Sequence, residues 1–195
     1  MKKIILASKS PRRLELLRML GLNVETAIPA VDESTVEADS PTHLAEKLAK
    51  LKAEDVYKSF HPEGNPVIAA DTLVEIGGKI LGKPRSVAEA GEMLRLLSGK
   101  LHYVHTGIAV IYSGTTASAV ETASVHFREL SNEEIDSYIM SGEPMDKAGA
   151  YGIQGRAGAF VDKIEGDFFA IVGLPLCRLV TLLGNTMGLA LSDFK

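Results

Sequence analysis

The residues best suited to chemistry form a short polar segment near the N-terminus, Ser8-Lys9-Ser10-Pro11-Arg12-Arg13. The first 18 residues carry six basic side chains and one acidic one, in a chain whose formal net charge is −4. Ser10 and Pro11 suit the N-cap and the first position of a helix, where free backbone N–H groups bind anions. The segment therefore indicates binding of an anion such as phosphate. A capped helix with solvated arginines is the alternative interpretation.

Two carboxylates follow predicted strands. Asp71 comes directly after the apolar run 67–70, at a strand's carboxyl end, where open α/β sheets place ligands. Glu33 lies in the polar loop 31–34, after the apolar stretch 24–28. If the fold brings both carboxylates to the N-terminal segment, they provide ligands for a hard cation such as Mg²⁺. The cation would polarise a phosphoryl oxygen, and a carboxylate that does not bind it could orient or deprotonate the attacking water. The alternative is that Asp71 caps a turn and Glu33 is a solvated loop acid.

A third candidate region, residues 146–155, is rich in small residues and contains a few polar ones. Glycines let the backbone approach a ligand closely, and Gln154 presents both a donor and an acceptor to the edge of a base. A flexible surface loop is the alternative. Taken alone, Lys52, Lys83 and Lys147 each fit a solvated lysine better than a functional one.

These residues must be positioned by alternating helices and strands, an α/β pattern. We expect helices that begin at or near Pro11 (closing at Gly21), Pro41 (to about Tyr57), Ser86 (to Ser98), Ser131 (to about Met140) and Pro175 (to Thr186). Ser86 with Glu89 and Ser131 with Glu134 predict capping boxes. Strands are expected over 4–7, 24–28, 67–70, 73–76, 79–81, 103–112 and 117–127, with turns at 77–78 and 113–114 and a loop at 61–66.

Composition bounds the class of protein. A chain of 195 residues with 46% hydrophobic content fits one domain, or two lobes around a cleft. The acidic balance argues against a nucleic-acid coat. The only cysteine, Cys177, allows no intrachain disulfide and is expected to be a core thiol in a reducing compartment. Pro175 and Arg178 interrupt the apolar stretch 168–183, so no membrane span and a cytoplasmic location are expected.

Four motifs, in this order and separation, closely resemble those of the Maf family of nucleotide pyrophosphatases. They are the segment 8–13, Ala70-Asp71-Thr72, Gly82-Lys83-Pro84 and the segment 146–155. The resemblance implies one domain over residues 1–195, with a mixed twisted sheet flanked by helices and two lobes around a central cleft, similar to inosine triphosphate pyrophosphatases. It implies cleavage of nucleoside triphosphates to monophosphate and pyrophosphate with a divalent cation, Mg²⁺ or Mn²⁺. Association into a homodimer stays open.

Carried over residue by residue, the resemblance assigns roles to positions of this chain. Asp71 matches the catalytic carboxylate, and Glu33 and Lys83 match polar residues that line the site, as do Ser8, Arg13 and Lys52. Arg12, Thr72 and Gln154 match positions associated with substrate choice. Thr72 and the string Tyr-Gly-Ile-Gln-Gly at 151–155 are similar to the dTTP/UTP type and differ from the 7-methyl-GTP type, which stays the alternative. Lys9, where the family often has a small residue, is a minor departure.

The resulting hypothesis places the metal on Glu33 and Asp71, and the triphosphate on the segment 8–13 and on lysines that include Lys52, Lys83 and Lys147. Water attacks the α-phosphorus and pyrophosphate leaves. Removal of non-standard nucleotides is one use of this reaction. The competing hypothesis is a non-catalytic nucleotide sensor that regulates cell division and septum formation.

Overall fold

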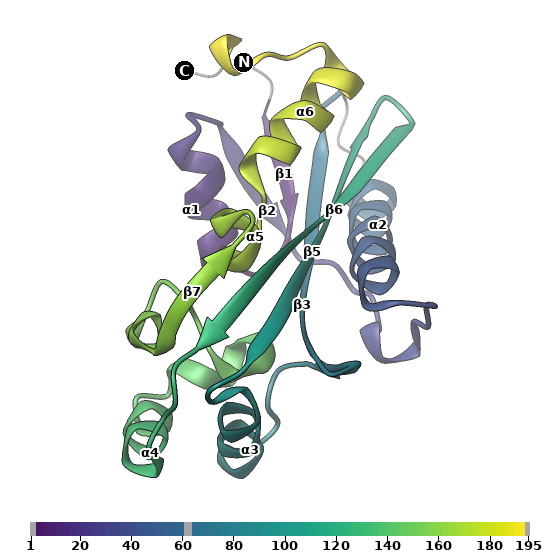
Figure 1. Ribbon diagram of the computed structural model, residues 1–195. Helices are drawn as coiled ribbons and strands as arrows, with labels where there is room; N and C mark the ends of the chain where they lie inside the picture. The colour runs from purple at the N-terminus through teal and green to yellow at the C-terminus, as the bar shows by residue number, and fades with distance from the viewer. Residues whose placement is uncertain (1–2, 61–63, 194–195) are drawn as a thin grey trace. The chain divides into compact units, whose positions relative to one another are not determined.

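The computed structural model describes residues 3–60 and 64–193, in which strands and helices alternate along the chain (Figure 1). Seven strands are hydrogen-bonded into one sheet in the order β2-β1-β3-β5-β6-β7, with β4 pairing β3. They are β1 (Ile4–Ala7), β2 (Val24–Ala27), β3 (Val67–Ile76), β4 (Lys79–Leu81), β5 (Leu101–Tyr112), β6 (Thr115–Phe127) and β7 (Val161–Glu165). Strand β1 is parallel to β2 and β3, whereas β3 with β4 and β6 with β7 are antiparallel. The predicted α/β class with a mixed sheet is confirmed.

The helices also follow the predicted pattern. The α-helices are α1 (Pro11–Met19), α2 (Pro41–Phe60), α3 (Val87–Leu97), α4 (Asn132–Met140), α5 (Phe168–Val172) and α6 (Leu176–Met187). Short 3₁₀ helices are η1 (Glu33–Thr35), η2 (Glu143–Asp146), η3 (Ala148–Ala150), η4 (Arg156–Phe160) and η5 (Leu191–Asp193). Sequence reasoning missed β7 and α5, which have five residues each and are too short to show a clear period.

The chain divides into two compact units, in agreement with the two-lobe expectation. The first unit contains Met1–Asp71, Thr106–Glu121 and Gly173–Lys195, and the second contains Thr72–His105 and Thr122–Val172. Strands β3, β5 and β6 contribute residues to both units.

In the first unit, helix α2 packs against β1, β3 and β5. Ala49, Ala53 and Val56 of α2 join a core of strand residues that includes Ile5, Ala69 and Ile111. A Cβ added to Gly107 of β5 would lie 2.2 Å from the carbonyl oxygen of Ala45, so helix and strand approach backbone to backbone here. The close approach buries the helix face that also carries Lys52.

The second unit has its own core, built largely from aromatic rings. Phe127 and Tyr151 pack edge to face with centroids 4.8 Å apart, and Tyr138 and Phe160 do so at 5.2 Å. Edge-to-face pairs at these separations contribute to stability beyond their buried area. Leucines from α3 and Ile135 from α4 complete this core. Helices α3 and α4 are thereby fixed against the unit's strands.

Several local predictions need correction. Strand β3 does not end before Asp71 but continues to Ile76, because Leu73 and Val74 are also buried. Leu6 of β1 pairs with Ile68 of β3, and β1 ends one residue later, at Ala7. Asp71 therefore still lies beyond the end of the neighbouring strand β1. The capping box of α4 is complete, whereas at α3 the Glu89 carboxylate accepts from the N–H of Arg85 rather than that of Ser86.

Two further expectations have different outcomes. Cys177 is exposed rather than in the core, because it follows Leu176 by one residue and so points away from the buried leucine face of α6. The predicted loop at 61–66 falls partly on residues 61–63, which lie outside the described residues.

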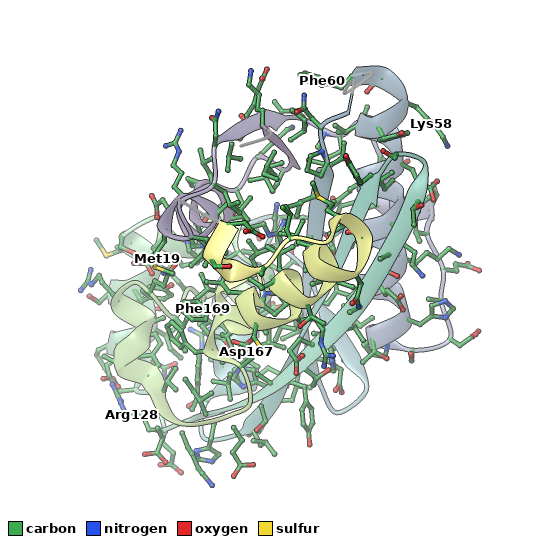
Figure 2. All side chains as sticks on the ribbon, turned by 90° about the horizontal axis from the view of Figure 1, so that it is seen from above. Met19, Lys58, Phe60, Arg128, Asp167 and Phe169 are labelled. Carbon is green, nitrogen blue, oxygen red and sulfur yellow. The ribbon has the colours of Figure 1, made fainter. Side chains whose placement is uncertain are left out.

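Within residues 3–60 and 64–193, every helix is too short or too polar to span a membrane. Large exposed apolar side chains are scattered, and Met19 of α1 and Phe60 at the end of α2 are two of them (Figure 2). Single exposed apolar residues of this kind are normal for a globular protein.

Candidate active site

Asp71 is the most unusual charged residue of the first unit. Its side chain is only 7% exposed, and its Oδ1 atom accepts a hydrogen bond from Nζ of Lys52. Its other oxygen, Oδ2, is buried without a hydrogen-bond partner among the described residues. Burial raises the pKa of Asp71, and the nearby charges of Lys52 and Arg13 oppose this shift. A buried carboxylate with one unpaired oxygen is suited to bind a cation or to accept a proton.

Lys52 joins the two predicted carboxylates. Its Nζ atom, on the buried face of α2, contacts Asp71 and also lies 2.7 Å from Oε1 of Glu33. Glu33 begins η1, and its side chain is 55% exposed. The structure therefore brings Glu33 and Asp71 together around one ammonium group, although 38 residues separate them in the sequence. Asp71 is thus a buried, paired carboxylate, and Glu33 pairs with the same ammonium group while its side chain stays more than half exposed.

Arg13 extends this cluster from helix α1. Its Nε donates to the carbonyl oxygen of Gly173 at 2.8 Å, and its Nη1 donates to the carbonyl oxygen of Ala70 at 2.8 Å. Nη1 also lies 3.3 Å from Oγ of Ser8. Arg13 therefore connects α1 to β3 and to the segment before α6, in addition to placing a positive charge near Asp71.

Ser8, rather than the side chain of Ser10, makes the hydroxyl contact at the start of α1. Ser10 occupies the N-cap position of α1 without a side-chain cap, and its own N–H donates to Oγ of Ser8 at 3.1 Å. Pro11 stands at the start of the helix as expected, and Gly21 follows its end with φ of 76°. Ser8 is 6% exposed, so its hydroxyl belongs to the buried polar cluster of Arg13, Lys52 and Asp71. Arg12 is half-buried on the same helix turn.

The donor set of this cluster fits a hard divalent cation. Mg²⁺ is commonly bound by one or two carboxylates, with phosphate and water oxygens as its other ligands. Asp71 provides an unpaired buried oxygen, and Glu33 is its acidic neighbour across Lys52. Within residues 3–60 and 64–193 no group of three or more His, Cys, Asp or Glu side chains is arranged to hold a metal. An ion held by Glu33 and Asp71 would complete its coordination with water or phosphate oxygens.

The remaining predicted residues belong to the second unit. Thr72 directly follows Asp71 on β3 and is half-buried. Lys83 is exposed in the segment after β4, and the carbonyl oxygen of the preceding Gly82 accepts from the N–H of Gly149 at 3.0 Å. This backbone bond joins the Lys83 segment to the glycine-rich segment 146–155 within the same unit.

The glycine-rich segment is folded into short turns rather than a loose loop. Residues Gly149, Ala150 and Tyr151 are buried, and the Tyr151 hydroxyl lies 2.9 Å from Nε2 of His102. Gly149 has φ of 67°, a left-handed conformation that glycine adopts without strain. Gln154 is exposed and lies in a turn. The turn is closed by the N–H of Gly155, which donates to the carbonyl oxygen of Gly152 at 3.0 Å.

Lys147 is bound within its own segment. Its Nζ donates to the carbonyl oxygen of Glu143 and to Oδ1 of Asp146, each at 2.6 Å. Sequence reasoning overlooked Glu143 and Tyr138, which contact the glycine-rich segment, and the carbonyl groups of Ala70 and Gly173, which accept from Arg13. Carbonyls are present at every position, so no sequence signal marks them. Glu143, by contrast, is an acidic residue three positions before the segment 146–155, so its place in the sequence could have suggested a contact with that segment.

Comparison of the sequence with a protein-family model identifies one family. The family model described as Maf-like protein matches residues 3–186. A dTTP/UTP pyrophosphatase of Symbiobacterium thermophilum is 51% identical over 183 residues, which cover 94% of this chain and 93% of that protein. A dTTP/UTP pyrophosphatase of Bacillus cereus is 49% identical over 180 residues, or 92% of this chain and 88% of that protein.

Among solved structures, the chain matches a protein described as Nucleoside-triphosphatase / dITP/XTP pyrophosphatase from Mycobacterium abscessus. The TM-score is 0.43 and the sequence identity is 16%, with 95% of this chain and 96% of that chain covered.

Proposed function

This chain belongs to the Maf family, and on that premise we propose that it hydrolyses nucleoside triphosphates to nucleoside monophosphate and pyrophosphate, with dTTP and UTP preferred. The observation that carries the proposal is the buried Asp71 carboxylate, held by Lys52 and left with one unpaired oxygen. Relatives about 50% identical over nearly the whole chain are named for this activity. We assign residues 1–195 to one Maf-like domain, since the family match runs from 3 to 186.

Asp71 is the proposed acceptor of the proton from the attacking water. Its pKa is raised by burial, which brings it closer to the operating pH of a general base. The water oxygen forms a bond to the α-phosphorus, the bond from that phosphorus to the bridging oxygen of the β-phosphate breaks, and pyrophosphate leaves. Lys52 holds the carboxylate in place during this step and limits its rotation.

Glu33 and Asp71 are the residues that would hold a divalent cation, Mg²⁺ or Mn²⁺, which when bound polarises a phosphoryl oxygen. Support comes from the acidic pair around Lys52 and the unpaired Asp71 oxygen. Because only two protein carboxylates are present in the cluster, the cation and the triphosphate are expected to bind together.

The phosphates are assigned to Ser8, Arg13 and Lys52 of the first unit, and Lys83 and Lys147, which belong to the second unit, are proposed for the same role. Guanidinium and ammonium groups stabilise the charge that develops on phosphoryl oxygens. The choice of base is assigned to Arg12, Thr72 and Gln154. An amide side chain matches part of the acceptor–donor–acceptor edge of uracil or thymine, and cytosine reverses two of those positions.

The test is a panel of nucleotides. The purified protein is incubated with Mg²⁺ or Mn²⁺ and, separately, with dTTP, UTP, dCTP, CTP, GTP, ATP and 7-methyl-GTP, and released pyrophosphate is measured. Turnover with dTTP and UTP above the others supports the proposal. Preference for 7-methyl-GTP would assign the chain to the other type. Stoichiometric binding without product would instead identify a nucleotide-sensing module.

The cation is tested in the same assay. Turnover should disappear with a chelator and return when Mg²⁺ or Mn²⁺ is added. Glu33→Gln should raise the metal concentration needed for half-maximal activity, because it removes one of the two charges assigned to the ion. Unchanged activity in the chelator would contradict the assignment of a metal to Glu33 and Asp71.

A further inference from the structure

Two side chains outside the recognised motifs hold the turn that carries Gln154. The Tyr138 hydroxyl donates to Oε1 of Glu143 at 3.0 Å and accepts from the N–H of Gly152 at 3.2 Å. The second carboxylate oxygen of Glu143, Oε2, accepts from the N–H of Arg156 at 3.2 Å. The two ends of the turn are therefore tied to one hydrogen-bonded pair, and all these residues belong to the second unit.

The pair is itself anchored in the core. Tyr138 lies on α4 with a side chain that is among the largest fully buried ones, packed edge to face on Phe160. Glu143 begins η2 directly after Gly142, whose φ of 73° turns the chain at the end of α4. The hydrogen bond fixes this support, because losing the carboxylate would leave the buried phenol hydroxyl without an acceptor.

Glycines at the turn leave the space that this support fills. A Cβ at Gly155 would lie 2.0 Å from Oε1 of Glu143, and one at Gly152 would lie 2.5 Å from Cε of Lys147. Gly155 has φ of −104°, which any residue adopts, so its backbone conformation does not require glycine. A side chain at position 155 would therefore displace the Glu143 carboxylate from the place where it accepts from Arg156.

We propose that Glu143 and Tyr138 are positioning residues for base selection: they fix the turn 152–156, so that the exposed amide of Gln154 meets the base in one orientation. This inference rests on the proposed function and deepens it. Hydrogen-bond readout of a base edge requires donors and acceptors held within a few tenths of an ångström, whereas contacts to phosphate charge tolerate more movement. Loosening the support should therefore lower selectivity more than turnover.

The first experiment compares kcat/KM for UTP and CTP in the parent, Tyr138→Phe and Glu143→Ala. Tyr138→Phe keeps the buried ring and removes the shared hydroxyl, so it preserves the core. We expect the UTP-to-CTP ratio to fall by about tenfold in both variants, while kcat for UTP changes by less than about threefold. Glu92→Ala, which removes an exposed carboxylate from α3 of the same unit, is the control and should leave the ratio unchanged.

Hydrogen exchange provides a readout that does not depend on activity. The Gly152 amide donates to the Tyr138 hydroxyl and the Arg156 amide to the Glu143 carboxylate, so the first should exchange at least about tenfold faster in Tyr138→Phe and the second in Glu143→Ala. In the Glu92→Ala control these amides should keep the parent rates. If neither amide exchanges faster, the support does not hold the turn and the inference is wrong.

A double-mutant cycle tests whether Gly155 and Glu143 act together. In the parent, Gly155→Ala should displace the carboxylate and lower the UTP-to-CTP ratio as Glu143→Ala does. In the Glu143→Ala background the same substitution should have little further effect, because the obstructing side chain is gone. Additive losses would overturn the proposed coupling.

The outcomes separate this inference from the proposed function. If the parent prefers UTP to CTP and both Tyr138→Phe and Glu143→Ala keep that preference, the inference fails and the proposed function stands. If the parent releases pyrophosphate without preference among pyrimidines, or releases none, the proposed base choice fails and the inference fails with it. A tenfold loss of the ratio in both variants, with faster exchange at Gly152 and Arg156, supports the inference.

Discussion

The ammonium group of Lys52 contacts Oδ1 of Asp71 from the buried face of helix α2 and leaves Oδ2 of the same carboxylate without a partner among the described residues. Pairing offsets part of the cost of burying both charges, but a fully satisfied pair would have no oxygen available for chemistry. This half-satisfied carboxylate is the feature on which the proposed reaction depends.

Asp71→Asn should lower pyrophosphate release by at least about 100-fold, because the amide keeps the shape but removes the charge needed for proton acceptance or metal binding. Circular dichroism should show a folded protein. Asp39→Asn, which changes a fully exposed carboxylate of the same unit, should retain parental activity. Activity within a few-fold of the parent at saturating metal would remove Asp71 from catalysis.

Arg13→Ala should weaken hydrolysis of every triphosphate to a similar degree, by about 100-fold, since a guanidinium that contacts phosphate conveys no information about the base. It should also lower the free energy of unfolding by about 2–4 kcal/mol, because the carbonyls of Ala70 and Gly173 lose a charged donor.

Arg13→Lys is the matched variant, which keeps the charge and loses the fork that reaches both carbonyls. Chemical denaturation and kcat/KM for UTP and CTP are the measurements. A loss of activity confined to one base would move Arg13 from phosphate contact to base recognition.

Gln154→Ala should reduce the preference for UTP over CTP by about tenfold, because one hydrogen-bonding side chain no longer distinguishes the two base edges. Activity that depends on phosphate contacts should change less. Asn185→Ala, which removes an exposed amide from α6, is the control. The ratio of kcat/KM values for the two nucleotides decides the matter, and an unchanged ratio would exclude Gln154 from base choice.

Stability should fall with acid because of His102. Burial lowers the pKa of this histidine to about 4, and the neutral ring hydrogen-bonds to the Tyr151 hydroxyl. Because the pKa is lower in the folded protein than in the unfolded chain, where it is near 6.5, the stabilising effect is fully present at pH values above 6.5. It is lost as the pH falls from 6.5 toward the pKa of the folded protein. Lowering the pH from 7.5 to 4.5 should therefore cost about 2–3 kcal/mol through this residue.

The measurement is urea unfolding of the parent and of His102→Gln at both pH values. The variant should be less stable at pH 7.5, and its disadvantage should shrink at pH 4.5, because His102 of the unfolded parent is protonated there whereas the folded parent, with a pKa of about 4, mostly does not bind that proton. Parallel pH dependences in the two proteins would show that His102 keeps an ordinary pKa in the folded state.

Much of the local structure follows from the sequence because its signals act between near neighbours. Pro11 and Gly21 mark the ends of α1, the glycines at 77 and 78 mark the hairpin between β3 and β4, and Ser131 with Glu134 forms a complete capping box. The family motifs are likewise short strings. They identify Asp71, Lys83 and Gln154 as candidates without any knowledge of their neighbours, whereas Glu33 is singled out by its polar loop after an apolar stretch.

Only the tertiary structure decided which of these groups meet and what supports them. Lys52 meets Asp71 across 19 residues of sequence, and Arg13 reaches the carbonyl of Gly173 across 160. Backbone carbonyls carry no residue type, so the sequence holds no mark of that second contact. Glu143 stands near a motif in the sequence, but its hydrogen bonds to Tyr138 and to the N–H of Arg156 appear only in the folded chain. Local patterns determine helices and strands through spacing, whereas burial and partner choice depend on packing between distant segments.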